Sequence, residues 1–188
     1  MAVGIRIAFK PSVQLGRMQT FAWDRNWNIT GATREDEAPT RFSWETVDGG
    51  TDIVYLEDPY IGVNYLVITG DSVVPVAEDV RSGLDCWTFE EASSHASGSA
   101  DRDAKIRGIY IGALSASRGE RDRLVSTFQQ LAGDPDPIIR HALLVGIGYV
   151  GPDARLRGIA EELRDNDPDD EVRRDAELLL EGLGGQGQ

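Results

Sequence analysis

The side chains that most often carry acid–base or nucleophilic chemistry are scarce in this sequence. The chain has two histidines, His95 and His141, and a single cysteine, Cys86. His95 lies in a run of small residues and His141 follows an arginine on a candidate helix, so we expect surface or packing roles. Cys86 adjoins Trp87, which favours a small buried hydrophobic residue over a nucleophile. The sequence contains no zinc-protease, nucleophile-elbow, phosphate-loop or dinucleotide motif, and we predict that the protein is not an enzyme.

One acidic segment, residues 165–170, can be compared with a known metal-binding loop. A calcium loop of the EF-hand type needs oxygen ligands at fixed positions, a glycine at its sixth position and a late glutamate. Here the glycine is missing and Pro168 interrupts the run. A helix-capping loop explains these residues better, so we predict no metal site and no cofactor.

A tryptophan-rich segment at 21–28 is a better candidate for a binding site. Phe21, Trp23 and Trp27 share it with Arg25 and several other polar residues. The simplest interpretation is that the rings pack against a sheet. The alternative is an interface loop in which Trp23, Arg25 and Trp27 contact a partner, because tryptophan and arginine are enriched at binding hot spots. A small ligand would also fit such a segment, but no polar cluster supports one.

Charge and composition narrow the class of partner. The 188 residues include 19 basic and 32 acidic side chains, a formal net charge of -13. Partners such as nucleic acids and anionic membranes need clustered positive charge, so we predict neither. A single cysteine excludes an intramolecular disulfide, no signal-peptide pattern is visible, and no apolar run approaches the roughly 18 residues of a membrane span. These observations favour a cytoplasmic protein.

Residues 1–91 follow the period of two that is typical of β-strands, and we predict an antiparallel β-rich domain there. Three strands joined by short turns predict a meander over 41–69, and a further strand over 3–9 has no readable partner. Apolar residues at helical spacing predict one short helix over 73–83. The fold of residues 10–40 cannot be read from the pattern.

Small residues at 92–100 predict a linker between this domain and a helical one at 101–184. In the helical half an aspartate and, in the clearer copies, a proline lie at the start of each repeated segment, where they cap free amide groups and fit the first turn. Two and a half helix pairs follow, and residues 185–188 are predicted to be a flexible tail. An apolar residue followed by arginine recurs every 33 residues, at Ile106-Arg107, Ile139-Arg140 and Val172-Arg173.

The repeated segments 134–142 and 167–184 resemble HEAT-like repeats, in particular the short bacterial class named after phycobilisome lyases. The resemblance extends over 101–184 and implies an α-solenoid of helix pairs used mostly for protein–protein contact. Two glycines, Gly146 and Gly148, depart from the family pattern, and each costs about 1 kcal/mol relative to alanine in a helix. We expect them to allow close helix packing.

The resemblance also implies that the recurring arginines pair with aspartates of a neighbouring repeat, which concerns Arg107, Arg140 and Arg173. Since a solenoid needs about three repeats for a continuous core, we expect the β domain or a partner to cover an open end. The whole chain is therefore predicted to be α+β: an N-terminal antiparallel β unit followed by a short C-terminal α-solenoid of HEAT-like helix pairs.

The function predicted from these features is a non-enzymatic protein–protein interaction module. One concrete form is an immunity-type inhibitor that binds and blocks a basic toxin or enzyme, because acidic charge steers basic partners. The alternatives are an adaptor or structural subunit of a larger bacterial or phage assembly, and a lyase-like or other HEAT-fold enzyme. If the second helix of each pair lines the concave face, its partner-binding residues would be Arg123, Gln130, Arg157 and Glu161.

Overall fold

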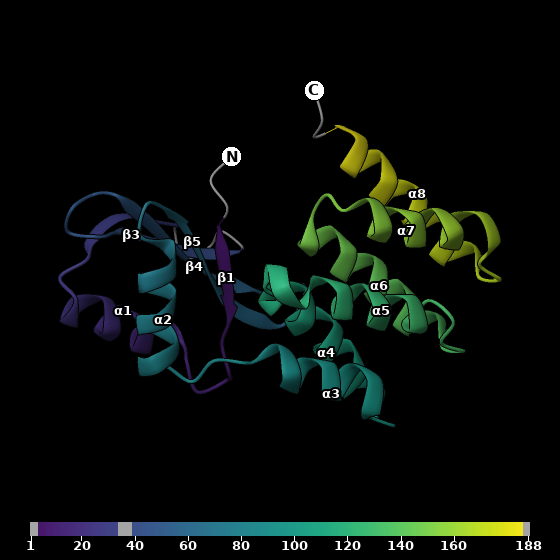
Figure 1. Ribbon diagram of the computed structural model, residues 1–188, viewed down its shortest axis with the longest axis horizontal. Coiled ribbons are helices and arrows are strands. Elements are labelled where there is room, and N and C mark those ends of the chain that lie inside the picture. Colours follow the sequence, from purple (N-terminus) through teal and green to yellow (C-terminus); the bar gives the residue numbers. More distant parts are fainter. Residues whose placement is uncertain (1–3, 34–38, 186–188) are drawn as a thin grey trace. The chain divides into compact units, whose positions relative to one another are not determined.

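The computed structural model describes residues 4–33 and 39–185, and the chain forms two compact units, Met1–Thr88 and Phe89–Gln188. The described part of the first unit contains an antiparallel five-stranded sheet and two helices, and the second unit is helical (Figure 1). The predicted α+β class is therefore confirmed. We call the two units the β unit and the helical unit.

The β unit is built on one sheet in the strand order β1-β5-β4-β3-β2, with every neighbouring pair antiparallel. The predicted meander is confirmed as β3, β4 and β5, and the partner of the first strand is β5. The strand β2 was not predicted. The strands are β1 (Ile5–Ala8), β2 (Asn28–Ala32), β3 (Thr40–Glu45), β4 (Thr51–Asp58) and β5 (Val63–Gly70).

Two helices, α1 (Leu15–Asp24) and α2 (Val73–Gly83), pack on one face of this sheet. Helix α2 confirms the prediction at 73–83, whereas α1 occupies the region that could not be read. Met18 and Phe21 of α1 and Val80 of α2 are buried in the same apolar cluster as the sheet. The sheet side chains of that cluster are Ile7, Trp44, Ile53, Tyr55, Leu66 and Ile68.

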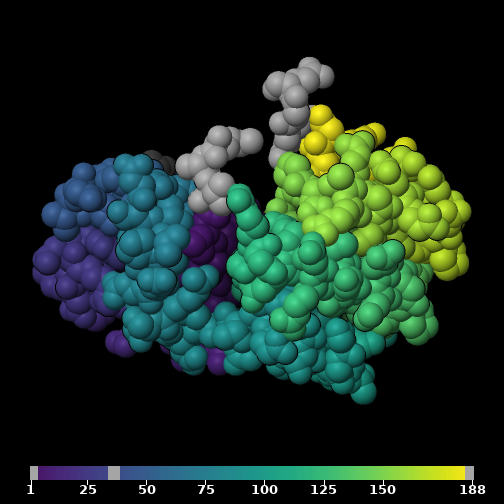
Figure 2. Space-filling view, viewed as in Figure 1, coloured from purple at the N-terminus to yellow at the C-terminus, as the bar shows by residue number. Residues whose placement is uncertain are grey.

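The helical unit consists of two layers. Helix α6 contacts both α4 and α8 in one layer, and α5 contacts both α3 and α7 in the other. In Figure 2 the unit appears as successive bands from teal through green to yellow, as expected for helices stacked in chain order. The helices are α3 (Phe89–Gly98), α4 (Arg102–Ser115), α5 (Arg121–Leu131), α6 (Pro137–Val150), α7 (Ala154–Asn166) and α8 (Asp170–Gly185), with a short 3-10 turn at Arg118–Glu120.

The linker predicted at 92–100 is wrong, because most of it belongs to helix α3. Its small residues serve a close helix–helix contact rather than a loop. A Cβ added at Gly108 of α4 would lie 2.5 Å from the Ala96 nitrogen and 2.7 Å from the Ala92 oxygen. Since α3 pairs with α4, the unit has three helix pairs in place of two and a half.

The expected capping residues begin the helices of this unit. Asp101, Asp136 and Asp153 each accept a hydrogen bond from a backbone N–H in the first turn of α4, α6 and α7. At Gly146 an added Cβ would lie 2.9 Å from Ile109 and 3.2 Å from Phe128, so close packing explains this glycine. The same explanation does not hold for Gly148, where the nearest contact is an ordinary 3.5 Å. Most of the predicted tail, residues 186–188, lies outside the described residues.

Candidate partner-binding surfaces

The tryptophan-rich segment forms the end of α1 and a short connection to β2. Trp23 is 82% exposed, whereas Trp27 packs edge-on against Phe21 at 5.8 Å between ring centroids. The Arg25 guanidinium stacks 3.3 Å from the centre of the Phe21 ring. Its Nη2 donates a hydrogen bond of 2.7 Å to Asp79 of α2, and this bond lowers the pKa of Asp79. Of the three proposed contact residues, Trp23 is exposed, whereas Arg25 and Trp27 are partly buried.

The four residues proposed on the second helices lie on α5 and α7, and most are engaged with neighbours. Arg123 donates to Glu90 of α3 at 2.7 Å and lies over the Phe89 ring. Arg157 donates to Glu161 of its own helix at 3.0 Å. Gln130 is exposed near the end of α5. These residues belong to the helical unit, so the structure does not combine them with Trp23 into one described site.

Ion pairs join successive helices within each layer at nearly constant spacing. In the α3–α5–α7 layer, Glu90 pairs with Arg123 and Asp122 with Arg155, both 33 residues apart. The α4–α6–α8 layer has the pair Arg102–Asp136 at its start, 34 residues apart. The recurring contacts show that the sequence period is also a spatial period, and that α3 belongs to it.

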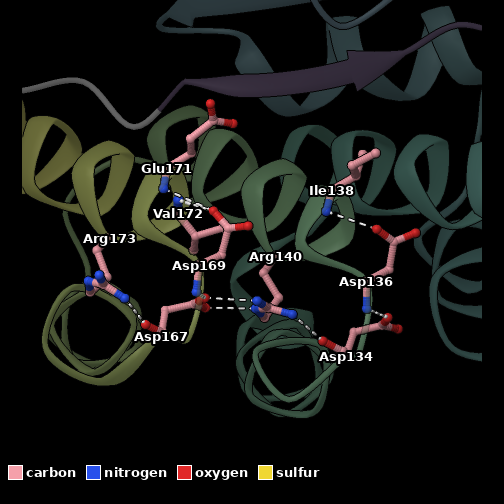
Figure 3. A network of polar contacts seen from close by, with 9 residues as sticks. All are labelled: Asp134, Asp136, Ile138, Arg140, Asp167, Asp169, Glu171, Val172 and Arg173. Atoms are coloured by element: carbon pink, nitrogen blue, oxygen red, sulfur yellow. Dashed lines mark hydrogen bonds and ion pairs between the residues drawn. The ribbon is translucent and has the colours of Figure 1, made fainter.

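A further ion pair, at a shorter spacing of 27 residues, is buried and joins Arg140 of α6 to Asp167, just before α8 (Figure 3). The two side chains share two hydrogen bonds of 2.7 and 2.8 Å, and a third Arg140 nitrogen donates to the Asp134 carbonyl. Burial alone would raise the pKa of Asp167. The hydrogen bonds from Arg140 and from the Asp169 N–H outweigh burial, and the pKa is lowered. This geometry holds two helix starts together and leaves the charges inaccessible to a substrate.

The resemblance-based pairing of the recurring arginines is therefore seen for Arg140 only. Arg107 is exposed, and the carboxylate of Asp134 is bound by Lys105 instead, at 2.8 Å. Arg173 contacts Asp170 and the Asp167 carbonyl at the start of its own helix. In this first copy of the repeat, Lys105 makes the ion pair with Asp134 that the resemblance would assign to Arg107.

The candidate catalytic side chains occupy separate places. His141 lies with its Nδ1 2.7 Å from Asp175, so it joins α6 to α8, and His95 is part of α3 rather than of a linker. Cys86 is partly buried, and burial raises the pKa of its thiol to about 11. The described residues include no group of three or more side chains that could hold a metal ion, and among them no helix is long and apolar enough to cross a membrane.

A surface that the sequence analysis missed lies at the β3–β4 turn. Glu45 of β3 and Asp52 of β4 are direct cross-strand partners, so two carboxylates share one face of the sheet. Asp48 in the turn accepts hydrogen bonds from the Thr46 hydroxyl and the Gly50 N–H, which lower its pKa. Asp71, after β5, has a carboxylate oxygen 3.6 Å from the Cβ position of Gly50, as does Asp48. We call Glu45, Asp48, Asp52 and Asp71 the acidic tip.

Within 4–33 and 39–185, no cation forms an ion pair with any carboxylate of the acidic tip. Like charges directly opposite one another destabilise a sheet, so the Glu45–Asp52 pair is expected to cost stability. The opposition of Glu45 and Asp52 could have been predicted from the sequence. A turn centred on Asp48-Gly49 places Glu45 and Asp52 at equal distances from it.

Comparison with known proteins gives no relative for this chain: no family model, no curated protein and no solved structure matches it.

Proposed function

We propose that the protein is a non-enzymatic interaction module that binds a basic protein through the acidic tip of its β unit. The proposal rests on Glu45 and Asp52, which lie directly opposite one another on neighbouring strands and have no ion-pair partner among the described residues. Repulsion between two such carboxylates is unfavourable for the isolated sheet. A basic partner would supply the missing counter-charge. Complementary charge of this kind also steers diffusional encounter and raises the association rate.

The helical unit supports the choice of this surface by contrast. Three of its carboxylates, Glu90, Asp122 and Glu161, each have an arginine partner at 3.0 Å or less. Charges that are already neutralised within the molecule contribute little to the attraction of a partner. Such paired carboxylates therefore add little to steering, whereas Glu45 and Asp52 of the acidic tip have no ion-pair partner among the described residues.

We further propose that the helical unit is a HEAT-like solenoid of three helix pairs. The 33-residue sequence period, the two layers and the ion pairs at matching spacing support this assignment. In this proposal α3 supplies the helix that completes the first pair. Solenoids of this kind serve protein contact, which is consistent with an interaction protein located in the cytoplasm.

The most specific form of the proposal is an inhibitor of the immunity type, which occupies the basic active site of a toxin enzyme. The test starts with affinity capture from the native source, identification by mass spectrometry and measurement of binding to the purified partner. Neutralising the tip with E45Q, D52N and D71N together is expected to weaken binding about tenfold or more, mainly through the association rate. Raising the salt from about 0.05 to 0.5 M is expected to slow association by wild type and to affect the triple variant less.

A matched control removes the same amount of charge elsewhere. The variant E90Q/D122N/E161Q also loses three exposed carboxylates, but each of them is paired with an arginine in the helical unit. It should bind the partner nearly as well as wild type. Equal weakening by both triple variants, or association that is independent of salt, would contradict the proposal. Binding that leaves the partner's enzymatic activity intact would favour an adaptor over an inhibitor.

A further inference from the structure

One exposed face of α8 carries a leucine between an arginine and a glutamate. Along α8, Arg174, Leu178 and Glu181 are spaced by four and three residues, so they lie on one face of the helix. All three are exposed, and Leu178 has 56% of its surface open to solvent. We propose that this stripe is a self-association surface, on which α8 of a second copy of the chain packs in antiparallel orientation.

The repeat register shows that this face corresponds to one that contacts the next helix of its layer. Subtracting 33 residues places Arg174, Leu178 and Glu181 at His141, Val145 and Gly148 of α6. On α6 that stripe faces α8: His141 binds Asp175, and the Cβ position of Gly148 is 3.5 Å from Leu179. Val145 lies between them and is partly buried. The same stripe on α8 is open in the described part of the chain.

Charge complementarity identifies a second copy as the occupant. Two antiparallel α8 helices related by a two-fold axis between Glu177 and Leu178 would bring Arg174 of each copy opposite Glu181 of the other. The two Leu178 side chains would meet next to the axis, and the interface would be the same patch on both copies. Within the described residues neither Arg174 nor Glu181 forms an ion pair, so both charges are available for this contact.

The charge nearest to the axis is Glu177, and it lies at the flank of the stripe. It is close enough to Arg164 of α7 to contribute to the raised pKa of that arginine, after the larger contribution of Asp165. Arg164 is itself paired with Asp165, so two Glu177 side chains near the axis oppose the dimer. The attraction comes from two Arg174–Glu181 pairs and from burial of the two leucines.

Sedimentation equilibrium of the full chain over a wide range of concentrations tests the proposal by charge reversal. The variants R174E and E181R each replace two attractive contacts in the dimer by two repulsive ones and should weaken dimerisation about tenfold or more. The double variant R174E/E181R restores opposite charges across the axis and should dimerise within about threefold of wild type. A role in monomer stability alone would not give this recovery.

The apolar contribution is tested by Leu178→Ser, which should weaken the dimer about thirtyfold because two leucines lose their burial. Val74→Ser is the matched control, since Val74 on α2 has a similar exposed fraction of 57%. Circular dichroism at 222 nm should show unchanged helix content for all variants. The proposal is overturned if wild type remains monomeric at millimolar concentration, if the double reversal fails to restore the dimer, or if Leu178→Ser and Val74→Ser behave alike. It is also overturned if α8 instead binds a different protein while the chain stays monomeric.

Discussion

The acidic tip and the Arg140–Asp167 pair use the same kind of side chain in opposite ways. Asp167 is buried, receives two hydrogen bonds from Arg140 and has a lowered pKa. Asp52 is exposed, stands opposite Glu45 and has no ion-pair partner among the described residues. Asp167 therefore holds two helix starts together, whereas Glu45 and Asp52 are expected to repel one another across the sheet.

This difference shows that net charge alone is a poor guide to a binding surface. Asp134 and Asp136 in the helical unit are bound by Lys105 and Arg102 and also accept backbone hydrogen bonds. They add to the charge of -13 but are already engaged in contacts within the helical unit.

The comparison can be tested because the tryptophans, Trp23, Trp27, Trp44 and Trp87, all lie in the β unit. Tryptophan fluorescence therefore reports on the β unit, and circular dichroism at 222 nm reports mainly on the helical unit.

The largest effect is expected from Arg140→Met. The substitution leaves Asp167 buried without its partner, and breaking a buried pair in this way costs about 3–5 kcal/mol. Urea unfolding followed at 222 nm should show the loss, with little change in the fluorescence transition. Arg157→Met is the control, because its pair with Glu161 is exposed and worth about 0.5 kcal/mol or less. Equal losses in the two variants would show that burial does not distinguish these pairs.

Acid should destabilise the helical unit more than the β unit, in whose described part the carboxylates with a lowered pKa are Asp48 and Asp79. The pKa values of Asp134, Asp153 and Asp167 are lowered in the folded helical unit by hydrogen bonds and nearby cations that outweigh burial. Their stabilisation is complete above the unfolded pKa of about 3.9 and is lost as the pH falls through the folded values. The transition at 222 nm should therefore shift to lower urea between about pH 5 and 3, and the shift should be smaller in Arg140→Met. An equal shift of the fluorescence transition would contradict the contrast between the units.

The close contact between α3 and α4 should be sensitive to one methyl group. Gly108→Ala would force a Cβ to within 3 Å of the α3 backbone, and such overpacking costs about 1–3 kcal/mol. Gly158→Ala on α7 is the control, because nothing lies within 4 Å of its Cβ position. Alanine there should stabilise the helix by up to about 1 kcal/mol. Opposite signs in urea unfolding at 222 nm are the expected result.

The contact at Gly108 also illustrates which elements the sequence patterns could predict and which they could not. The strands at 41–69 and the helix at 73–83 followed because alternation and helical spacing are local properties of the chain. Helix α3 was missed because its residues are small and polar, and such residues are also typical of loops. The available signal was the spacing of Ala92 and Ala96 by four residues, matched by Gly108 and Gly112. That spacing makes sense only once two helices face one another.

The candidate surfaces were harder to predict than the fold. Arg25 was proposed as a contact residue, but its partners Phe21 and Asp79 lie on two different helices. A tertiary contact of this kind leaves no periodic trace in the sequence. The opposition of Glu45 and Asp52, in contrast, follows from the position of the turn. Register is therefore the link by which local sequence patterns can reveal a charged surface.

The smallest effect, and the one closest to function, is expected from Asp52→Asn. Removing the repulsion with Glu45 should stabilise the β unit by about 0.2–1 kcal/mol, because like charges no longer oppose one another on the sheet. Urea unfolding followed by tryptophan fluorescence measures this gain, which should shrink in about 1 M salt as the repulsion is screened. Glu161→Gln, followed at 222 nm because it lies in the helical unit, is the control, since it removes an attractive contact with Arg157 and should leave stability equal or slightly lower. In the proposed complex, the basic partner would offset this repulsion. Loss of stability in Asp52→Asn would mean that the carboxylate is satisfied within the chain, and the case for the acidic tip as a docking surface would fall with it.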